Sequence, residues 1–103
     1  MALQKPMELS TGIVLDNSYH RLTSVILDYI NKNFQLVVSI FVNQQMREEG
    51  KNQILTNYYT NSDRETFDEY FSIESLNQSG QNPVERGYVY LKSLPDYQDG
   101  VDI

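Results

Sequence analysis

The clearest pattern in the chain is the alternation of apolar and polar side chains between residues 34 and 43. A period of two places successive side chains on opposite faces of a strand. The segment therefore predicts a strand with one buried face, formed by Phe34, Leu36, Val38, Ile40 and Val42.

A second strand is predicted over residues 19–30, which are rich in aromatic and β-branched side chains. The polar residues 31–33 separate it from the first, so the two strands predict a hairpin. Val25, Ile26 and Leu27 are consecutive and break the alternation, and we expect either a β-bulge or a strand covered on both faces. With a further strand over 53–60, the core strands are expected within residues 19–60.

The remaining segments before the last loop give weaker patterns. Residues 1–6 are interpreted as a flexible N-terminal arm, and residues 12–15 as a short strand followed by a turn over 16–18. Residues 44–52 are polar and predict a surface loop or a short helical turn. Residues 67–76 fit both a period of two and helical spacing, and we favour the strand.

A helix is predicted over residues 83–94. Asn82 is a good N-cap, Pro83 suits the first helical position, and Glu85 stands three residues after the cap, where its carboxylate can reach back. Val84, Tyr88, Leu91 and Leu94 then recur at steps of three and four residues, and Pro95 ends the helix. Residues 96–103 are expected to form an irregular acidic tail.

These elements predict one domain over residues 1–103, since a chain of this length holds one core. The expected fold class is mainly β (α+β). We expect a small antiparallel sheet, curled into a barrel or stacked as a sandwich, with one C-terminal α-helix packed on it.

Charge and composition exclude several function classes. The net charge is −6, from 14 acidic and 8 basic residues, and the basic residues are scattered singly. Nucleic acid and anionic membrane surfaces are therefore not expected partners. The longest apolar stretch, 34–42, is too short to span a bilayer. Cysteine is absent, which excludes disulfides and thiolate chemistry and favours folding in a reducing cytoplasm.

The sequence contains no recognisable catalytic or metal-binding motif. His20 is the single histidine and is expected on a strand surface or in a turn, bonded to its neighbours. Asp96, Asp99 and Asp102 recur every third residue, which is not the ligand spacing of a calcium loop. No serine lies in a nucleophile elbow, and no glycine-rich phosphate loop occurs. We therefore expect no enzyme activity, no cofactor and no metal.

The eight tyrosines supply the candidate contact residues. Tyr88 is expected in the core, and Tyr58 and Tyr59 are expected on opposite faces of a strand. Phe41, Tyr58 and Tyr59 are the candidate interface residues, either between copies of a homo-oligomer or with another protein. The alternative is a carbohydrate-binding module that uses grouped aromatic rings to recognise a host cell-wall glycan.

Both ends of the chain resemble a known family. The segment 88–103 (YVYLKSLPDYQDGVDI) and the N-terminal features MALQK, Gly12-Ile13 and Tyr19-His20-Arg21 are similar to small accessory proteins encoded in the tail or baseplate gene region of phages and prophages of Gram-positive bacteria. The middle of the chain departs from that pattern, after Val42 and over 63–82. The resemblance implies a structural protein of the virion tail or baseplate, made in the bacterial host cytoplasm, with no cofactor and no catalytic residue.

Overall fold

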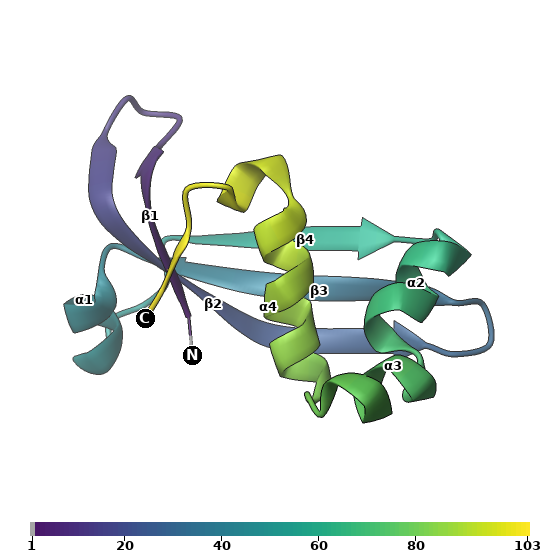
Figure 1. The fold of residues 1–103 in the computed structure, drawn as a ribbon. Helices are drawn as coiled ribbons and strands as arrows, with labels where there is room; N and C mark the ends of the chain where they lie inside the picture. The colour runs from purple at the N-terminus through teal and green to yellow at the C-terminus, as the bar shows by residue number, and fades with distance from the viewer. Residues whose placement is uncertain (1) are drawn as a thin grey trace.

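The computed structural model describes residues 2–103 and contains a five-stranded antiparallel sheet with α2, α3 and α4 on one face (Figure 1). The strand order is β4-β3-β2-β1-β5. The elements, in chain order, are β1 (Leu3–Glu8), β2 (Val14–Asp28), β3 (Asn33–Phe41), α1 (Gln44–Glu48), β4 (Leu55–Asn61), α2 (Arg64–Phe71), α3 (Ile73–Ser79), α4 (Pro83–Ser93), the 3-10 turn η1 (Pro95–Tyr97) and β5 (Val101–Asp102). The predicted α+β class with an antiparallel sheet is confirmed. A barrel or sandwich is not confirmed, because the sheet is open.

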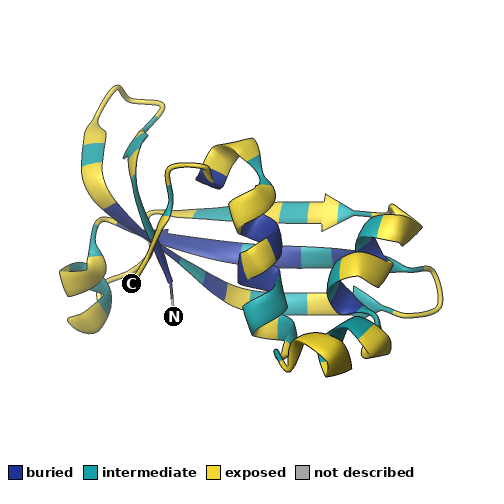
Figure 2. Cartoon of the chain, in the orientation of Figure 1, coloured by how far each residue is buried: buried dark blue, intermediate teal, exposed yellow. Residues whose placement is uncertain are grey.

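The core lies between one face of the sheet and the helices. Figure 2 shows β3 largely buried, with α4 lying across the sheet. The predicted buried face of β3 is confirmed from Phe34 to Ile40, whereas Val42 lies beyond the end of the strand and is 37% exposed. The largest fully buried side chains come from β1, β3, α2 and α4: Leu3, Leu36, Val38, Ile40, Phe67, Phe71 and Leu91.

The predicted hairpin and bulge are both present. The whole of β3 pairs with residues 19–28 of β2, and the two strands are joined by residues 29–32. The carboxylate of Asp28 accepts hydrogen bonds from the backbone N–H groups of Ile30 and Asn31 at 3.0 and 3.1 Å, which holds the turn. The register shifts between Leu22 and Ser24, so the bulge lies just before the consecutive apolar residues that predicted it.

Helix α4 forms where the sequence predicts it, and its capping box is complete. Asn82 Oδ1 accepts from the N–H of Glu85 at 2.8 Å, and Glu85 Oε1 accepts from the N–H of Asn82 at 3.2 Å.

The prediction of one helix is wrong. Residues 64–79 form α2 and α3, because Asp63 and Ser72 each cap a helix and Phe67 and Phe71 sit four residues apart on one buried face.

The predictions of a flexible N-terminal arm and of an irregular C-terminal tail are also wrong for the described residues. Residues 3–8 form β1, which pairs with β2, and Val101–Asp102 pair with Leu3–Gln4 as β5. The predicted turn over 16–18 lies inside β2. Two residues of this segment, Asp16 and Asn17, lie opposite the single residue Pro6, which is the arrangement of a β-bulge. Proline has no backbone N–H and is tolerated at such a position. Both chain ends therefore contribute to the sheet.

Candidate functional site

The sheet has an outer face that the core helices leave uncovered. Because side chains alternate along a strand, the residues between the buried positions of β2, β3 and β4 point away from α2, α3 and α4. The register places these outer-face residues side by side across the three strands. The outer face consists of Arg21, Ser24, Ile26, Asp28, Asn33, Gln35, Val37, Ser39, Thr56, Tyr58 and Thr60.

One end of this side of the sheet is closed by α1. Phe41 is 7% exposed and forms a small buried cluster with Ala2 and Tyr19, whose ring centroid lies 6.0 Å from that of Phe41. The guanidinium of Arg47, on α1, lies 5.8 Å from the centroid of the Phe41 ring. The prediction of Phe41 as an interface residue is therefore corrected: its ring is already buried within this chain.

The uncovered outer face has two charged side chains on β2, Arg21 and Asp28, and none on β3 or β4. Tyr58 is 64% exposed and Ile26 is 53% exposed, and Val37 lies between their strands. The remaining outer-face side chains of β3 and β4 are hydroxyls and the amides of Asn33 and Gln35. Interface centres in proteins are depleted in charge and enriched in tyrosine. In a chain with net charge −6, the part of the outer face formed by β3 and β4 therefore resembles an interface centre in composition.

The edge of the sheet formed by β4 is unprotected. Its residues, Leu55–Asn61, include no charged side chain and no proline, and its register with β3 runs without a shift from Phe34↔Asn61 to Ile40↔Leu55. The opposite edge differs, since it carries Lys5, Pro6, a register shift and the two-residue strand β5. Natural sheets use these devices to block edge-to-edge pairing. Only the β4 edge of this sheet lacks them all within the described residues.

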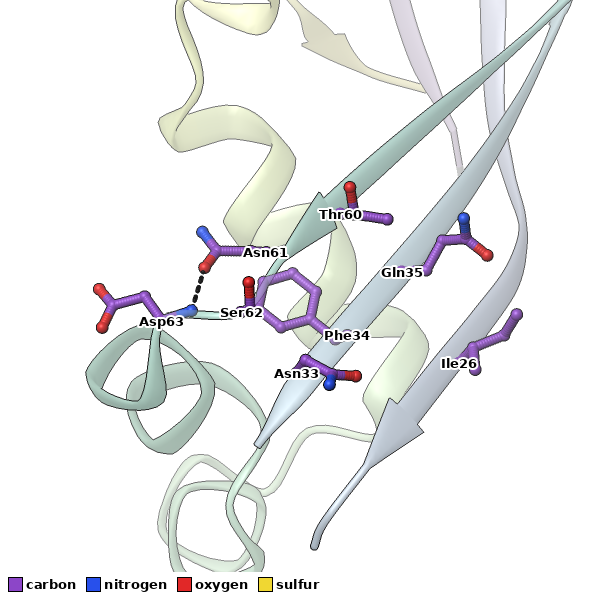
Figure 3. A pocket seen from close by; sticks show the side chains of 8 residues that line it. All are labelled: Ile26, Asn33, Phe34, Gln35, Thr60, Asn61, Ser62 and Asp63. Carbon is purple, nitrogen blue, oxygen red and sulfur yellow. Dashed lines mark hydrogen bonds between the residues drawn. The ribbon is translucent and has the colours of Figure 1, made fainter. Parts of the chain in front are cut away.

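A depression of about 630 Å³ opens where the β2–β3 hairpin and the end of β4 meet (Figure 3). Amide and hydroxyl groups, including those of Asn33, Gln35 and Thr60, surround it. Asn61 Oδ1 already accepts from the N–H of Asp63 at 2.7 Å. Phe34, the aromatic residue of the lining, is only 2% exposed. The depression therefore offers polar contacts but no exposed ring on which a sugar could stack.

A buried polar cluster joins β1, β2 and the C-terminal segment. Ser18 Oγ lies 2.7 Å from His20 Nε2, and His20 Nδ1 lies 2.9 Å from the Tyr97 hydroxyl oxygen. Ser18 Oγ donates to the backbone carbonyl of Lys5 at 2.6 Å. Because this bond uses the serine proton, His20 Nε2–H donates to Ser18 and His20 Nδ1 accepts from Tyr97. The expectation of a surface histidine is wrong: His20 is 4% exposed.

Burial keeps this histidine neutral. The pKa of His20 is lowered from 6.5 to about 4, chiefly by desolvation and also by the nearby ammonium of Lys5, while Asp99 opposes the shift. Burial also raises the pKa of Tyr97 above its ordinary value, so its hydroxyl stays protonated and can donate to His20. Serine beside imidazole is a pair used by hydrolases. Here Ser18 is fully buried and its proton is held by a main-chain carbonyl, an arrangement that locks strands together.

The structure does not bring the three candidate interface residues together. Tyr58 and Tyr59 lie on opposite faces of β4, as predicted: Tyr58 is on the outer face, and the Tyr59 hydroxyl donates to Asp96 Oδ2 at 3.3 Å on the helix side. Tyr88 is buried, as predicted. Tyr29 is the other exposed tyrosine of the described chain, but its ring packs edge-on against Phe67, on the helix side of the sheet. Tyr58 is therefore the one predicted interface residue that is available for contact.

Within residues 2–103 no group of three or more acidic, histidine or cysteine side chains is arranged to hold a metal ion. In the same range, none of the helices has the length and apolar content needed to cross a membrane. Comparison with protein-family models, curated proteins and solved structures gives no match to this chain. The candidate site therefore rests on the outer face and the β4 edge alone.

Proposed function

We propose that this chain is a non-enzymatic structural or accessory protein of a bacteriophage tail or baseplate. It acts by protein–protein assembly, is made in the bacterial host cytoplasm and is incorporated into the virion. The observation that carries the proposal is the unprotected β4 edge beside the uncovered, uncharged outer-face residues of β3 and β4. A protein that must stay separate from its neighbours blocks such an edge.

The resemblance at the two chain ends supports the same assignment. The segments that carry it, Tyr19-His20-Arg21 and residues 88–103, lie together in the fold, since His20 bonds Tyr97 and β5 pairs with β1. These residues pack the sheet against α4 and the C-terminal segment. Their role is thus to maintain the fold, and the contact surface lies elsewhere, on β4 and the outer face.

Assembly is favoured over carbohydrate binding by the position of the aromatic rings. Stacking on a sugar requires exposed rings on one face, beside polar groups. In the described chain the two exposed tyrosines, Tyr29 and Tyr58, lie on different sides of the sheet, and the Tyr29 hydroxyl is bonded to the backbone oxygen of Phe71. We therefore propose a protein, not a glycan, as the partner of this surface.

The test is the location of the protein in particles. Phage particles produced by the strain that carries this gene are purified, washed with high salt and digested for quantitative mass spectrometry. We expect the chain at a fixed copy number relative to the major tail protein, and we expect its deletion to give defective tails. Absence from washed particles, together with normal tails after deletion, would contradict the proposal.

A further inference from the structure

We propose that β4 pairs with β4 of a second copy of this chain, antiparallel and with Tyr58 on the two-fold axis. The inference rests on the proposed function, because it names one partner of the assembly surface. Adding a strand to a free edge satisfies backbone N–H and C=O groups that otherwise bond only to water. The pairing joins two five-stranded sheets into one continuous sheet.

The edge is accessible for this pairing. In the sheet, β4 is bonded to β3 on one side and is the terminal strand on the other (Figure 1). The contacts that the β4 side chains make with Tyr90 and Asp96 lie on the helix side and leave the edge free. The unbroken register with β3 keeps β4 regular along its length, as a pairing template requires.

The outer-face positions of β4 are symmetric about Tyr58. When an antiparallel pair is centred on Tyr58, this residue faces Tyr58 of the second copy, and Thr56 faces Thr60 of the second copy. The outer-face positions of β4 thus read Thr, Tyr, Thr in either direction. Aromatic pairs and threonine pairs are among the favourable cross-strand neighbours. A heterologous partner would not require this symmetry.

Charged side chains flank β4 at both ends, but none lies within the strand. The strand itself carries no charge, so two copies with net charge −6 do not repel each other along the edge. Exposed Glu48, Glu49 and Lys51 precede the strand, and exposed Asp63, Arg64 and Glu65 follow it. An antiparallel pair places the start of one strand beside the end of the other, so charges of both signs meet at each end of the paired strands.

Tyr58 is suited to a position on the two-fold axis because its side chain is exposed and makes no polar or ring contact within the part of this chain that the structure describes. It is 64% exposed, and among residues 2–103 no hydrogen bond or ring contact involves it. On pairing, each Tyr58 ring gains an aromatic neighbour without losing a contact in its own chain. The same freedom lets the residue be replaced without disturbing the monomer.

The test uses two charged variants, Tyr58→Lys and Tyr58→Glu, and measures solution mass by light scattering over a concentration series. The wild-type chain is expected to dimerise reversibly. Each variant alone places like charges opposite each other, so its dissociation constant should rise by at least about tenfold. An equal mixture of the two should dimerise again, because the Lys and Glu side chains then face each other across the axis.

The matched control is Ile26→Lys. Ile26 is exposed on the same outer face but lies on β2, away from the edge, so this variant should dimerise like the wild type. Circular dichroism melts verify that every variant folds. A wild-type mass of 12.0 kDa at all concentrations overturns the proposal, as do unchanged dimerisation of Tyr58→Lys or a mixture that stays monomeric.

The light-scattering test of β4 pairing is independent of the test that locates the protein in particles. A chain that is monomeric but present in washed particles removes the β4 pairing and leaves the proposed function intact. A chain that dimerises through Tyr58 but is absent from particles supports the β4 pairing and contradicts the proposed function.

Discussion

His20 and Tyr97 are 77 residues apart in sequence, yet His20 Nδ1 lies 2.9 Å from the Tyr97 hydroxyl oxygen. Their rings meet edge-on, with centroids 5.3 Å apart. Ser18 bonds the other ring nitrogen, and among the described residues no buried side-chain nitrogen or oxygen lacks a hydrogen-bond partner. This contact fixes the C-terminal segment to β2 and makes the fold sensitive to the protonation of a single residue.

The protein should lose stability as the pH falls from about 6.5 to about 4. The folded-state pKa of His20, about 4, lies below its unfolded value of 6.5, so the unfolded chain binds more protons in this window. The contribution is fully present above pH 6.5, and about 3 kcal/mol of it is lost by pH 4. Urea unfolding at several pH values measures this loss.

The control for the pH effect is His20→Gln, which keeps a side-chain amide in the buried position. This variant is expected to be less stable at pH 7. Its free energy of unfolding should nevertheless fall less steeply than that of the wild type between pH 6.5 and 4. Equal slopes in the two proteins would show that other groups cause the acid sensitivity.

Tyr97→Phe should destabilise the protein by about 1–3 kcal/mol, because it removes the donor to His20 Nδ1 and leaves a buried acceptor without a partner. Tyr58→Phe makes the same chemical change at an exposed residue and should alter stability by less than about 0.5 kcal/mol. Thermal and urea unfolding at pH 7 and at low protein concentration compare the two. Similar losses for both variants would contradict the role assigned to Tyr97.

Gly87 is expected to be intolerant of a side chain, because α4 packs closely on the sheet at this point. A β-carbon at position 87 would stand 2.6 Å from Leu22 Cδ2, in the buried core. Overpacking lowers the free energy of unfolding by about 1–3 kcal/mol, and the better helix propensity of alanine offsets up to about 1 kcal/mol of this loss. Gly87→Ala should therefore lower the free energy of unfolding.

Two comparisons isolate the cause. Val89→Ala, at an exposed position of the same helix, should change stability little. In a Leu22→Ala background the cost of Gly87→Ala should shrink or change sign, since the clashing methyl group is gone. An unchanged cost in that background would place the steric conflict elsewhere.

Local patterns predict part of this fold. The alternation from Phe34 to Ile40 and the capping residues Asn82 and Glu85 each depend on neighbours in sequence, and both elements form as expected. The strand predicted over residues 67–76 is wrong, because this segment suits a period of two at 70–73 but also fits helical spacing at Phe67, Tyr70 and Phe71, and it forms parts of α2 and α3. The caps Asp63 and Ser72 were the signals that would have resolved it.

Other features depend on contacts distant in sequence. β1 and β5 contain few of the residues typical of strands, and they are stabilised by pairing with each other and with β2. The burial of Phe41 under α1 and the bond between His20 and Tyr97 likewise join separate segments. Sequence predicted opposite faces for Tyr58 and Tyr59, but which face is uncovered depends on where α2, α3 and α4 pack.

The central claim, that the β4 edge is an assembly surface, is tested most directly by amide hydrogen exchange at low and high protein concentration. The account predicts that exchange of amides in Leu55–Asn61 slows as the concentration rises, whereas amides at the opposite edge, in Lys5–Glu8, exchange at an unchanged rate. Exchange in β4 that is independent of concentration, or protection that appears on another element instead, would contradict it.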